Sequence, residues 1–587
     1  MNFLKQVLAT ITGVLITGVI LFFAFIFFIA VLVSSSSSET NVPAPANSLL
    51  YLSMDYAITE KSESNPLNDL DLPFGVGAKE VGLNDILARI KAAKTDDNIK
   101  GIFLNPTTVG SGFATLKAIR DALVDFKTSK KFIVAYSDGY SQKAYYLSSV
   151  ADKVYLNPQG SLDFRGLSSS TMFMKDAFDK LGVEMQVVKV GTFKSAVEPL
   201  ILNSMSEANR LQVTSYLNSI YDAFLDDLSA GRKISKESLR QYADTYAVRN
   251  ADDALKYKFI DGKLYKDELI AEIKKRLSLA DKDDISIVPV TKYAGSKEEI
   301  KGSDEIAVLY AYGDIVDGEG ESGQIGGDKI SRELRKLRQD DKVKAVVLRV
   351  NSGGGSALAS DIIWREVELT KKVKPIIVSM GDYAASGGYY IAAAADSIFA
   401  EKATLTGSIG VFGVIPNFKG LMNNKLGVKF EDVKTGKFAS LMSTPDKPLT
   451  EEEKAIIQGE VNNTYQTFMD RVAKGRKMTI AQVDSIGQGR VWTGDQALKI
   501  GLVDRIGDLN TAINAAASKG KLSSYYTKEY PAKQDPFASI FSTSKDKIKT
   551  WMFAEELGEY QKYLMELKKV MNQTGIQARL PYAVEIY

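Results

Sequence analysis

The chain repeats its own sequence at an offset of about 244 residues, and this duplication constrains its fold more than any other feature. In the first pair of matching segments, DDNIKGIFLNP corresponds to DDKVKAVVLRV. The matching pairs of segments begin at Asp96 and Asp340, at Lys130 and Val373, and at Gly182 and Gly427. Solenoid repeats have periods of roughly 20 to 50 residues, so this offset is too long for a solenoid. It indicates two copies of one domain.

Each copy has the pattern of an α/β domain. Ala345–Val350 and Pro375–Met380 are continuous apolar runs, as expected for strands of a parallel sheet covered on both faces. Helical patterns lie between and after them, at Ser331–Gln339, Ala357–Thr370 and Ser386–Ala395. Alternation of strands and helices predicts parallel strands joined by crossover connections.

The repeat and its flanks predict four regions, in which copy one is residues 47–300 and copy two is residues 301–540. The polar stretch Lys292–Asp304 is the expected linker between the copies. Residues 541–587 are expected to form a helical tail, because Lys545–Asn572 is charged and helical in pattern. This tail is either a solvated helix or an element that caps the fold or mediates assembly.

Residues 1–46 are expected to hold a cytoplasmic tip, a transmembrane helix and a linker. Gln6–Val33 contains no charged residue and is mostly apolar, and a helix needs about 20 such residues to cross a bilayer. A signal peptide has a shorter apolar region and a small-residue cleavage site, and no clear site of that kind follows Val33. Lys5 precedes the span, so the positive-inside rule places the N-terminus in the cytoplasm and the remainder on the other side.

The chain contains neither histidine nor cysteine. These absences exclude Ser-His-Asp triads, HExxH zinc motifs, thiol nucleophiles and disulfides. Hydrolytic chemistry would therefore depend on Ser, Thr, Lys, Asp, Glu or Tyr. The net charge is +2, which gives no reason to expect a nucleic-acid partner.

Ser386 is a candidate nucleophile within MGDYAASGGYYIAAAA, where an apolar strand ends and a helix begins. Unpaired backbone N–H groups at a helix start suit a developing oxyanion, and Gly387 offers one of them. The simpler alternative is that Ser386 is only an N-cap.

A second candidate element is the glycine run Gly353-Gly354-Gly355, which follows a buried strand in VLRVNSGGGSALAS. Consecutive glycines can direct backbone N–H groups at an anion. They would complete an oxyanion hole with Gly387, or they form only a flexible turn. The third element is Lys194 in VVKVGTFKSAVEP, which on its own is more simply read as a solvated lysine.

The segments GTFKSAVEP, NSGGGS and AASGGYY, with TLTGSIGVFG, resemble the signal peptide peptidase A (protease IV) family in its long, duplicated, membrane-anchored bacterial form. The resemblance runs from about Leu49 to about Ala517, plus the anchor. It implies a tandem Clp/crotonase-like fold. It also implies that Ser386 is the nucleophile, that Lys194 is the general base, and that Gly354 and its neighbours donate to the oxyanion. The family often has Pro at the position of Gly353, which leaves open whether Gly354 or Gly355 donates.

The repeat supports this assignment independently. Ser386 aligns with Gln142 of copy one, and Lys194 aligns with Ala439 of copy two. Each copy therefore lacks the group that the other retains, as expected of a duplicated enzyme whose site is divided between its halves.

The resemblance further implies a serine endopeptidase that degrades cleaved signal peptides and other apolar peptides without metal or cofactor. It would be a homotetramer in the bacterial inner membrane, single-pass, with its catalytic part on the periplasmic side. Lys194 would need a lowered pKa, which burial between the copies would provide. Two alternatives stay open: an inactive membrane-tethered scaffold on the same fold, and acyl-CoA chemistry of the crotonase type, against which an extracytoplasmic location argues.

Overall fold

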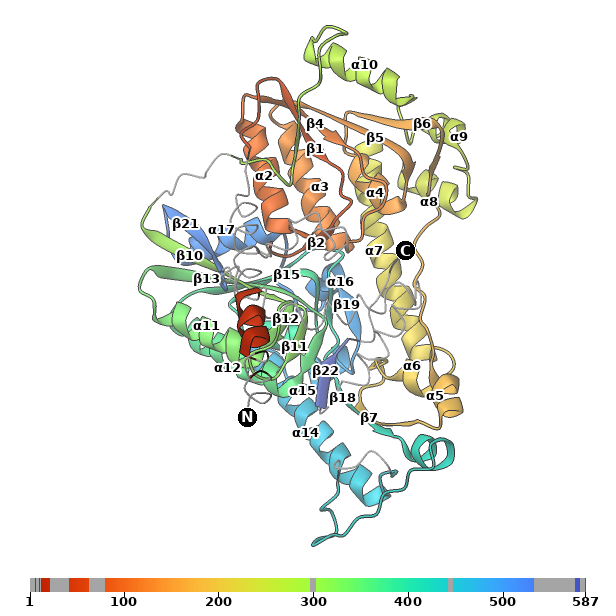
Figure 1. Ribbon diagram of the computed structural model, residues 1–587, viewed down its shortest axis with the longest axis vertical. Coiled ribbons are helices and arrows are strands. Elements are labelled where there is room, and N and C mark those ends of the chain that lie inside the picture. The colour runs from red at the N-terminus through yellow and green to blue at the C-terminus, as the bar shows by residue number, and fades with distance from the viewer. Residues whose placement is uncertain are drawn as a thin grey trace.

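The computed structural model describes residues 6, 10, 12–21, 42–62, 80–295, 302–441, 447–532, 576–580 and 586. Two α/β units lie against each other, and Figure 1 shows copy one above copy two. Helix α7 (Glu207–Arg232) runs from copy one along the side of copy two (Figure 1).

The core of copy one is a parallel sheet of six strands in the order β8-β6-β5-β4-β1-β9. Each neighbouring pair is parallel, which confirms the predicted α/β architecture. The strands are β1 (Ser48–Leu52), β4 (Ile99–Leu104), β5 (Phe132–Tyr140), β6 (Lys153–Leu162), β8 (Gly262–Lys263) and β9 (Ile287–Pro289). Helices α2 (Leu83–Thr95) and α3 (Phe113–Lys127) pack on one face, and α10 (Lys266–Leu277) packs on the other.

Copy two has an eight-stranded sheet built on the path β19-β17-β15-β13-β10-β21, with β16 paired to β15 and β20 paired to β16. The central strands β10, β13 and β15 are parallel, and most of their residues are buried and apolar. The strands are β10 (Asp304–Tyr312), β13 (Val343–Ser352), β15 (Ile376–Ala385), β16 (Ser397–Ala400), β17 (Leu405–Gly407), β19 (Val491–Thr493), β20 (Arg505–Ile506) and β21 (Tyr525–Tyr530).

The predicted helices of copy two are present, with differences in length. Helix α12 (Ala357–Lys371) matches the expected segment, whereas helix α11 (Gly327–Gln339) begins four residues before the predicted Ser331. Helix α13 extends only over Gly387–Ala392, shorter than the predicted Ser386–Ala395, because the chain turns at Ala393–Ala395 to enter β16. Helix α17 (Leu509–Lys519) covers the opposite face of the sheet.

The duplication is visible in matching elements. Helix α7 and helix α14 (Glu451–Arg476) each have 26 residues, and each ends at a lysine in the left-handed conformation, Lys233 and Lys477. In both helices the N-cap side chain accepts a backbone N–H three residues later. The sequence repeat is therefore a structural repeat.

A third sheet joins the two copies, in the order β12-β11-β14-β22-β18-β7. Strand β7 of copy one pairs antiparallel with β18 of copy two, from Val411 opposite Val190 to Asn417 opposite Glu184. The strands are β7 (Glu184–Val190), β11 (Asp314–Val316), β12 (Gln324–Gly326), β14 (Gly354–Ser356), β18 (Val411–Asn417) and β22 (Ile576–Arg579). Because β7 leads directly to Lys194, this sheet carries the copy-one turn to the copy-two site.

Parts of three predicted segments lie outside the described residues. Residues 12–21 of the predicted anchor are helical, whereas residues 22–33 are not described. Among the described residues, no helix combines the length and the apolar character that crossing a membrane requires. The helical pattern at Lys545–Asn572 and residues 296–301 of the linker also fall outside the description. The described part of the tail that follows is strand β22.

Candidate active site

Ser386 occupies a sharp turn between β15 and α13. Its backbone has φ 55° and ψ −115°, a conformation that non-glycine residues rarely adopt and that stores strain. Its N–H donates to the Gly407 carbonyl at 2.8 Å, and its carbonyl accepts from Tyr390 N at 2.8 Å. The residue is fully buried in this turn.

Lys194 reaches this turn from copy one. It follows β7 in a turn closed by its own N–H, which donates to Gly191 O at 3.1 Å, and its side chain is fully buried. Lys194 Nζ lies 2.8 Å from Ser386 Oγ. It also contacts the Ser408 hydroxyl at 3.1 Å and the Ser408 carbonyl at 3.2 Å. The structure thus brings together the two side chains that the repeat left in different copies.

Burial alone accounts for the shifted pKa of Lys194. The loss of water around the ammonium lowers the pKa of Lys194 well below the usual lysine value. The three described partners of Nζ are two hydroxyls and a carbonyl, and none carries a charge. The environment therefore favours the neutral amine.

Two residues that the sequence analysis did not assign also shape the lysine site. Ser408 has φ 51° and directs both of its oxygens at Nζ. Gly489 has φ 78°, and a Cβ there would lie 2.6 Å from the Lys194 backbone nitrogen. The sequence could have indicated Ser408, because the repeat aligns it with Phe164 of copy one. The two copies thus differ in residue type at this position, as they do at Ser386 and Gln142.

The candidate oxyanion glycines lie beside the serine turn. Gly354 has φ 101°, and a Cβ there would lie 2.7 Å from Gly387 N and 3.1 Å from Ala385 O. Its N–H donates to Ser352 Oγ at 3.1 Å. Gly355 is paired on both sides of β14, with Ala578 of β22 and with Ile315 of β11. Gly354 and Gly387 therefore adjoin each other, and Gly355 is one step further along β14.

The C-terminal strand β22 crosses the site. It is antiparallel to β14 on one side and to β18 on the other. Ala578 is fully buried, and a Cβ on Gly354 would lie 2.1 Å from its carbonyl oxygen. Leu580 donates its N–H to Gly353 O at 2.6 Å, and its side chain joins an apolar cluster that contains Ala385. The chain's own tail therefore lies as an extended strand next to the serine turn.

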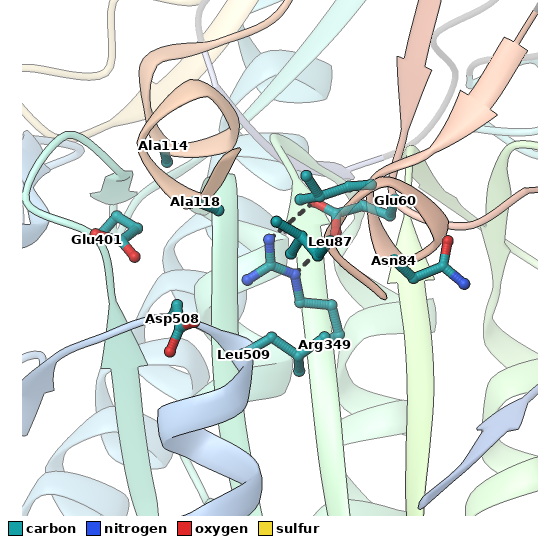
Figure 2. Close-up of a pocket in the computed structure, with 10 residues that line it drawn as sticks. Glu60, Asn84, Leu87, Ala114, Ala118, Arg349, Glu401, Asp508 and Leu509 are labelled. Atoms are coloured by element: carbon teal, nitrogen blue, oxygen red, sulfur yellow. Dashed lines mark hydrogen bonds and ion pairs between the residues drawn. The ribbon is translucent and has the colours of Figure 1, made fainter. Parts of the chain in front are cut away.

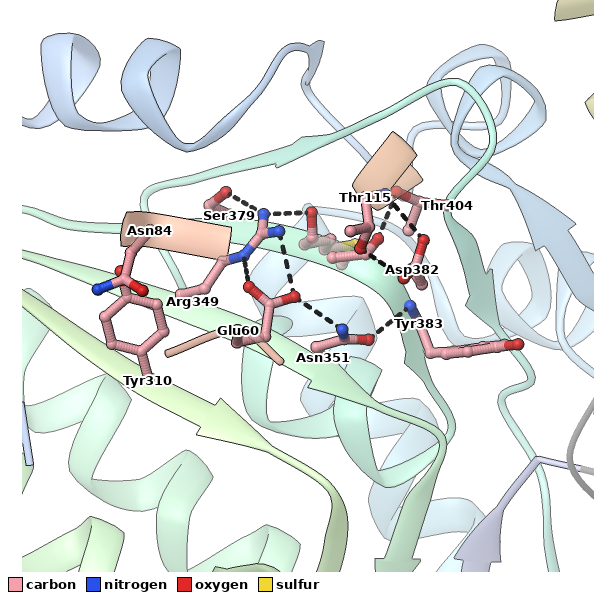
Figure 3. Close-up of polar contacts among 12 residues, drawn as sticks. Glu60, Asn84, Thr115, Tyr310, Arg349, Asn351, Ser379, Asp382, Tyr383 and Thr404 are labelled. Carbon is pink, nitrogen blue, oxygen red and sulfur yellow. Dashed lines mark hydrogen bonds and ion pairs between the residues drawn. The ribbon is translucent and has the colours of Figure 1, made fainter. Parts of the chain in front are cut away.

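A buried polar network holds the strands behind the site (Figure 3). Arg349 on β13 donates to both oxygens of Glu60, at 2.8 and 3.2 Å. Glu60 also accepts from Asn351 Nδ2 at 2.7 Å, and Asn351 Oδ1 accepts from Tyr383 N at 3.0 Å. The register between β13 and β15 shifts at this point. Asn351 fills the irregularity by its bond to Tyr383, which lies three residues before Ser386 in the chain.

Asp382 makes a second polar contact between the two copies. Its carboxylate accepts from Thr115 N at 3.0 Å and from Thr115 Oγ1 at 2.6 Å (Figure 3). Helix α3 begins after Gly112, which has no side chain to cap it, and a Cβ on Gly112 would lie 2.3 Å from Asp382. A carboxylate of copy two therefore caps a helix of copy one.

A small pocket lies between the copies near this network (Figure 2). It is lined by Glu60, Leu83, Asn84, Leu87, Ala114 and Ala118 of copy one and by Arg349, Glu401, Asp508 and Leu509 of copy two. Burial raises the pKa of Glu401 to about 7. Within the described residues, no group of three or more carboxylates is arranged to hold a metal ion.

The equivalent place in copy one is filled by a glutamine. Gln142 Nε2 donates to Gly166 O at 2.7 Å, and Gln142 Oε1 accepts from the N–H groups of Arg165 and Gly166 at 3.0 Å each. The Gln142 side chain thus forms hydrogen bonds with the copy-one loop whose counterpart in copy two surrounds Ser386. In copy two, the Ala439 N–H donates to Gly436 O at 3.2 Å, which closes the same kind of turn as at Lys194. Ala439, however, is exposed.

Comparison with known proteins agrees with the duplication. The model of peptidase family S49 matches residues 125–280 and 368–523, one match in each copy. Protease 4 of Haemophilus influenzae is 35% identical over 528 residues, which covers 85% of this chain and 83% of that protein. Protease 4 of Salmonella typhi is 36% identical over 526 residues, which covers 87% and 84%.

Among solved structures, ClpP1 from Listeria monocytogenes aligns with 34% of this chain and 91% of its own, with 15% identity and a TM-score of 0.22. The family match and the two relatives each extend over more than half of the chain. The chain therefore belongs to peptidase family S49 and is a serine protease that carries the family's domain twice.

Proposed function

We propose that Ser386 is the nucleophile and Lys194 the general base with which this protease hydrolyses peptide bonds. The observation that carries the proposal is the 2.8 Å approach of Lys194 Nζ to Ser386 Oγ between two fully buried side chains. Because burial lowers the pKa of Lys194, the neutral amine that can accept a proton from the hydroxyl is present at lower pH than for a free lysine.

In this mechanism Ser386 Oγ attacks the scissile carbonyl carbon while its proton passes to Lys194 Nζ. The tetrahedral intermediate collapses, the C–N bond breaks, and Lys194 returns the proton to the leaving amine. Water then attacks the carbonyl carbon of the Ser386 ester while its proton passes to Lys194 Nζ. The ester C–O bond breaks, the proton returns to Ser386 Oγ, and the acid product leaves. No cofactor enters any of these steps.

The proposed oxyanion donors are the N–H groups of Gly387 and of the β14 glycines. Gly354 adjoins Gly387 N, which favours it over Gly355 as the second donor, provided that its N–H exchanges Ser352 Oγ for the oxyanion when substrate binds. Removing one such donor typically costs 10²–10³ in kcat. Both glycines face the backbone of β22, Gly354 opposite Arg579 and Gly355 opposite Ala578, so β14 offers an edge with which an extended peptide would pair.

Apolar peptides are the proposed substrates, bound as an extended strand in the place that β22 takes. Ala578 of β22 and Leu580, which follows the strand, are 0% and 5% exposed and lie in apolar surroundings. A peptide in this place would pair with β14 and β18 and insert alternate side chains. By resemblance to the signal peptide peptidase A family, we propose cleaved signal peptides as the natural class.

We also propose that the protease is anchored in the bacterial inner membrane by Gln6–Val33, with both copies on the periplasmic side, and that it is a homotetramer. The support for the anchor is its length without charge and Lys5 before it. The tetramer is implied by the family resemblance. An anchored enzyme would meet released signal peptides at the membrane that holds them.

A fluorophosphonate probe tests the catalytic assignment. We expect the wild-type chain to be labelled at Ser386, as mapped by mass spectrometry of the modified peptide. Ser386→Ala and Lys194→Ala should each lose labelling and hydrolysis of an apolar fluorogenic peptide. Ser386→Ala should keep its fold, because it removes only a hydroxyl group. Lys194→Ala removes a fully buried side chain, so its Tm and circular dichroism spectrum are measured beside its activity.

Ser148→Ala is the matched control, since Ser148 is also a fully buried serine and its hydroxyl has no hydrogen-bond partner among the described residues. This variant should keep wild-type labelling and turnover. Undiminished turnover in Ser386→Ala would reject the assignment. Absence of labelling and turnover in the folded wild type would favour an inactive membrane-tethered scaffold.

A further inference from the structure

Gln212 on helix α7 is a buried amide that contacts both neighbours of Lys194. The residue is 1% exposed. Its Nε2 donates to the Phe193 carbonyl at 3.0 Å and to Ser195 Oγ at 2.8 Å. Phe193 and Ser195 directly precede and follow Lys194 in the chain. One side chain of α7 therefore holds the turn that carries the proposed general base.

The other end of the same amide reaches copy two. Gln212 Oε1 accepts from Val491 N at 3.1 Å, where β19 begins. The carbonyl of that peptide group belongs to Arg490 and accepts from Ser408 N at 2.7 Å. Ser408 in turn contacts Lys194 Nζ with its hydroxyl and its carbonyl. A single peptide group thus connects the residue that holds the lysine turn to the residue that holds the tip of the lysine side chain.

The hydrogen bonds fix the orientation of the Gln212 amide. Turned over, it would place its NH₂ group against the Val491 N–H and its oxygen against the Phe193 carbonyl. The amide is also held from behind, because Nε2 donates to Asn209 Oδ1 at 3.1 Å and Asn209 Nδ2 donates to Glu198 at 3.0 Å. A buried polar network in which each member is paired is rigid, and this one lies directly behind the lysine turn.

The repeat shows that the glutamine accompanies the lysine. Helices α7 and α14 have the same length and begin at Glu207 and Glu451, so Ile456 takes the place of Gln212 in copy two. Ile456 is 37% exposed. The copy in which Ala439 replaces the lysine therefore has an apolar residue where the other copy has a buried amide.

A second glutamine shows what an amide that only joins the two copies looks like. Gln186 on β7 is 7% exposed, and its Oε1 accepts from Leu449 N of copy two at 3.0 Å. Like Gln212, it bonds a copy-two backbone N–H from copy one. It belongs to the strand, however, and not to the turn that carries Lys194. The pair of glutamines can therefore separate docking of the copies from placement of the lysine.

We infer that Gln212 is a positioning residue for Lys194. It ties the lysine turn to β19, so that Nζ stays within hydrogen-bond distance of Ser386 Oγ. The inference rests on the proposed role of Lys194 as general base. Without the amide, the turn would be free to move away from β19 and water would reach Nζ. Renewed contact with water would raise the pKa of Lys194 toward the usual lysine value.

Gln212→Met tests the inference, because it keeps an unbranched side chain of similar length and removes both ends of the amide. We expect kcat for an apolar fluorogenic peptide to fall at least about tenfold with KM nearly unchanged, since the Phe193 carbonyl and the Val491 N–H lose their partner. The ionisation in the pH profile of kcat/KM should move to higher pH. Fluorophosphonate labelling carried to completion counts the folded sites, so a loss of fold is not mistaken for slow turnover.

Gln186→Met is the matched control. It should lower Tm by a similar amount and leave kcat and the ionisation at their wild-type values. Ser195→Ala is a milder variant that removes only a hydroxyl group and should fold, and its kcat should fall about fivefold. Equal losses of kcat in the two glutamine variants, or wild-type kcat and pH profiles in Gln212→Met and Ser195→Ala, would overturn the inference.

Lys194→Ala, measured in the same assay, distinguishes this inference from the proposed function. Turnover that survives Lys194→Ala would reject the general base and the positioning role together. An inactive Lys194→Ala beside a Gln212→Met variant that behaves like Gln186→Met would reject the positioning role alone.

Discussion

Lys194 Nζ and Ser386 Oγ lie 2.8 Å apart although 192 residues separate them in the chain. The approach depends on the β7–β18 ladder, which carries a copy-one turn onto copy two. The site therefore exists only when both copies are folded and docked. Duplication has allowed each copy to keep one of the two groups, and the vacant position of copy one is filled by Gln142.

The lowered pKa of Lys194 predicts how activity depends on pH. The neutral amine is the proton acceptor, so kcat/KM should rise with pH through one ionisation well below that of free lysine. Turnover of an uncharged apolar peptide, measured from pH 6 to pH 10, gives the profile. A profile that is flat over this range would contradict the assignment of Lys194, because the chain has no histidine to supply another base.

Ser408 should act by positioning Lys194. Ser408→Ala removes a hydroxyl 3.1 Å from Nζ but keeps the backbone carbonyl contact. A hydrogen bond of this kind is worth about 1 kcal/mol, so we expect kcat to fall about fivefold with KM nearly unchanged. Steady-state kinetics over the same pH range should also show a shifted ionisation. An effect on KM alone would point to a role in substrate binding instead.

The strand β22 should compete with peptide substrates. Leu580→Ala removes most of a buried side chain that anchors the strand, and such changes typically cost 2–5 kcal/mol when the site does not relax. We expect KM for an apolar peptide to fall by tenfold or more, as the strand leaves its place next to β14. A raised KM with an unchanged Tm would instead show that β22 is a fixed wall of the peptide site.

Much of this arrangement follows from the sequence, and the reasons for the exceptions are physical. Apolar runs and the repeat predict the two parallel sheets, since each strand must be covered on both faces. Resemblance and the complementary losses at Gln142 and Ala439 single out Ser386 and Lys194. Their roles in catalysis stay proposals. The domain limits also stay predictions.

Contacts between distant segments could not be predicted in this way. Periodicity says which face of a strand is buried, but not which strand lies beside it, so the β7–β18 ladder and the insertion of β22 are visible only in the structure. The same holds for Arg349 with Glu60, an ion pair between residues 289 positions apart. Ser408 differs from these, because comparison with Phe164 of copy one would have marked it.

Glu401 should make the stability of the protein depend on pH. Its pKa is about 7 in the folded chain and near 4.5 when exposed, so between these values the folded state binds more protons. The free energy of unfolding should fall as pH rises through this window, by about 3 kcal/mol in total. Glu401→Gln should raise Tm at pH 8 and leave it nearly unchanged at pH 5, as calorimetry would show. Glu460→Gln, at an exposed carboxylate on α14, is the control and should change neither value.

The repeat itself yields the last prediction. Ala439 lies in the same backbone turn as Lys194, with its N–H donating to the carbonyl three residues earlier, and GTFKSAV and GKFASLM match at Gly, Phe and Ser. Ala439 is nevertheless exposed, whereas Lys194 is buried against Ser386. A lysine at position 439 would therefore keep its usual pKa and point away from the serine.

We accordingly expect Lys194→Ala to be inactive and the Lys194→Ala/Ala439→Lys double variant to remain inactive, as measured by peptide turnover and fluorophosphonate labelling. Rescue should need a serine opposite the new lysine as well, at Gln142. Even then the loop around position 142 differs, because Lys143 and Ala144 replace the two glycines that follow Ser386. Full activity in the double variant would show that copy two can assemble the site alone, and the division of the site between the copies would have to be abandoned.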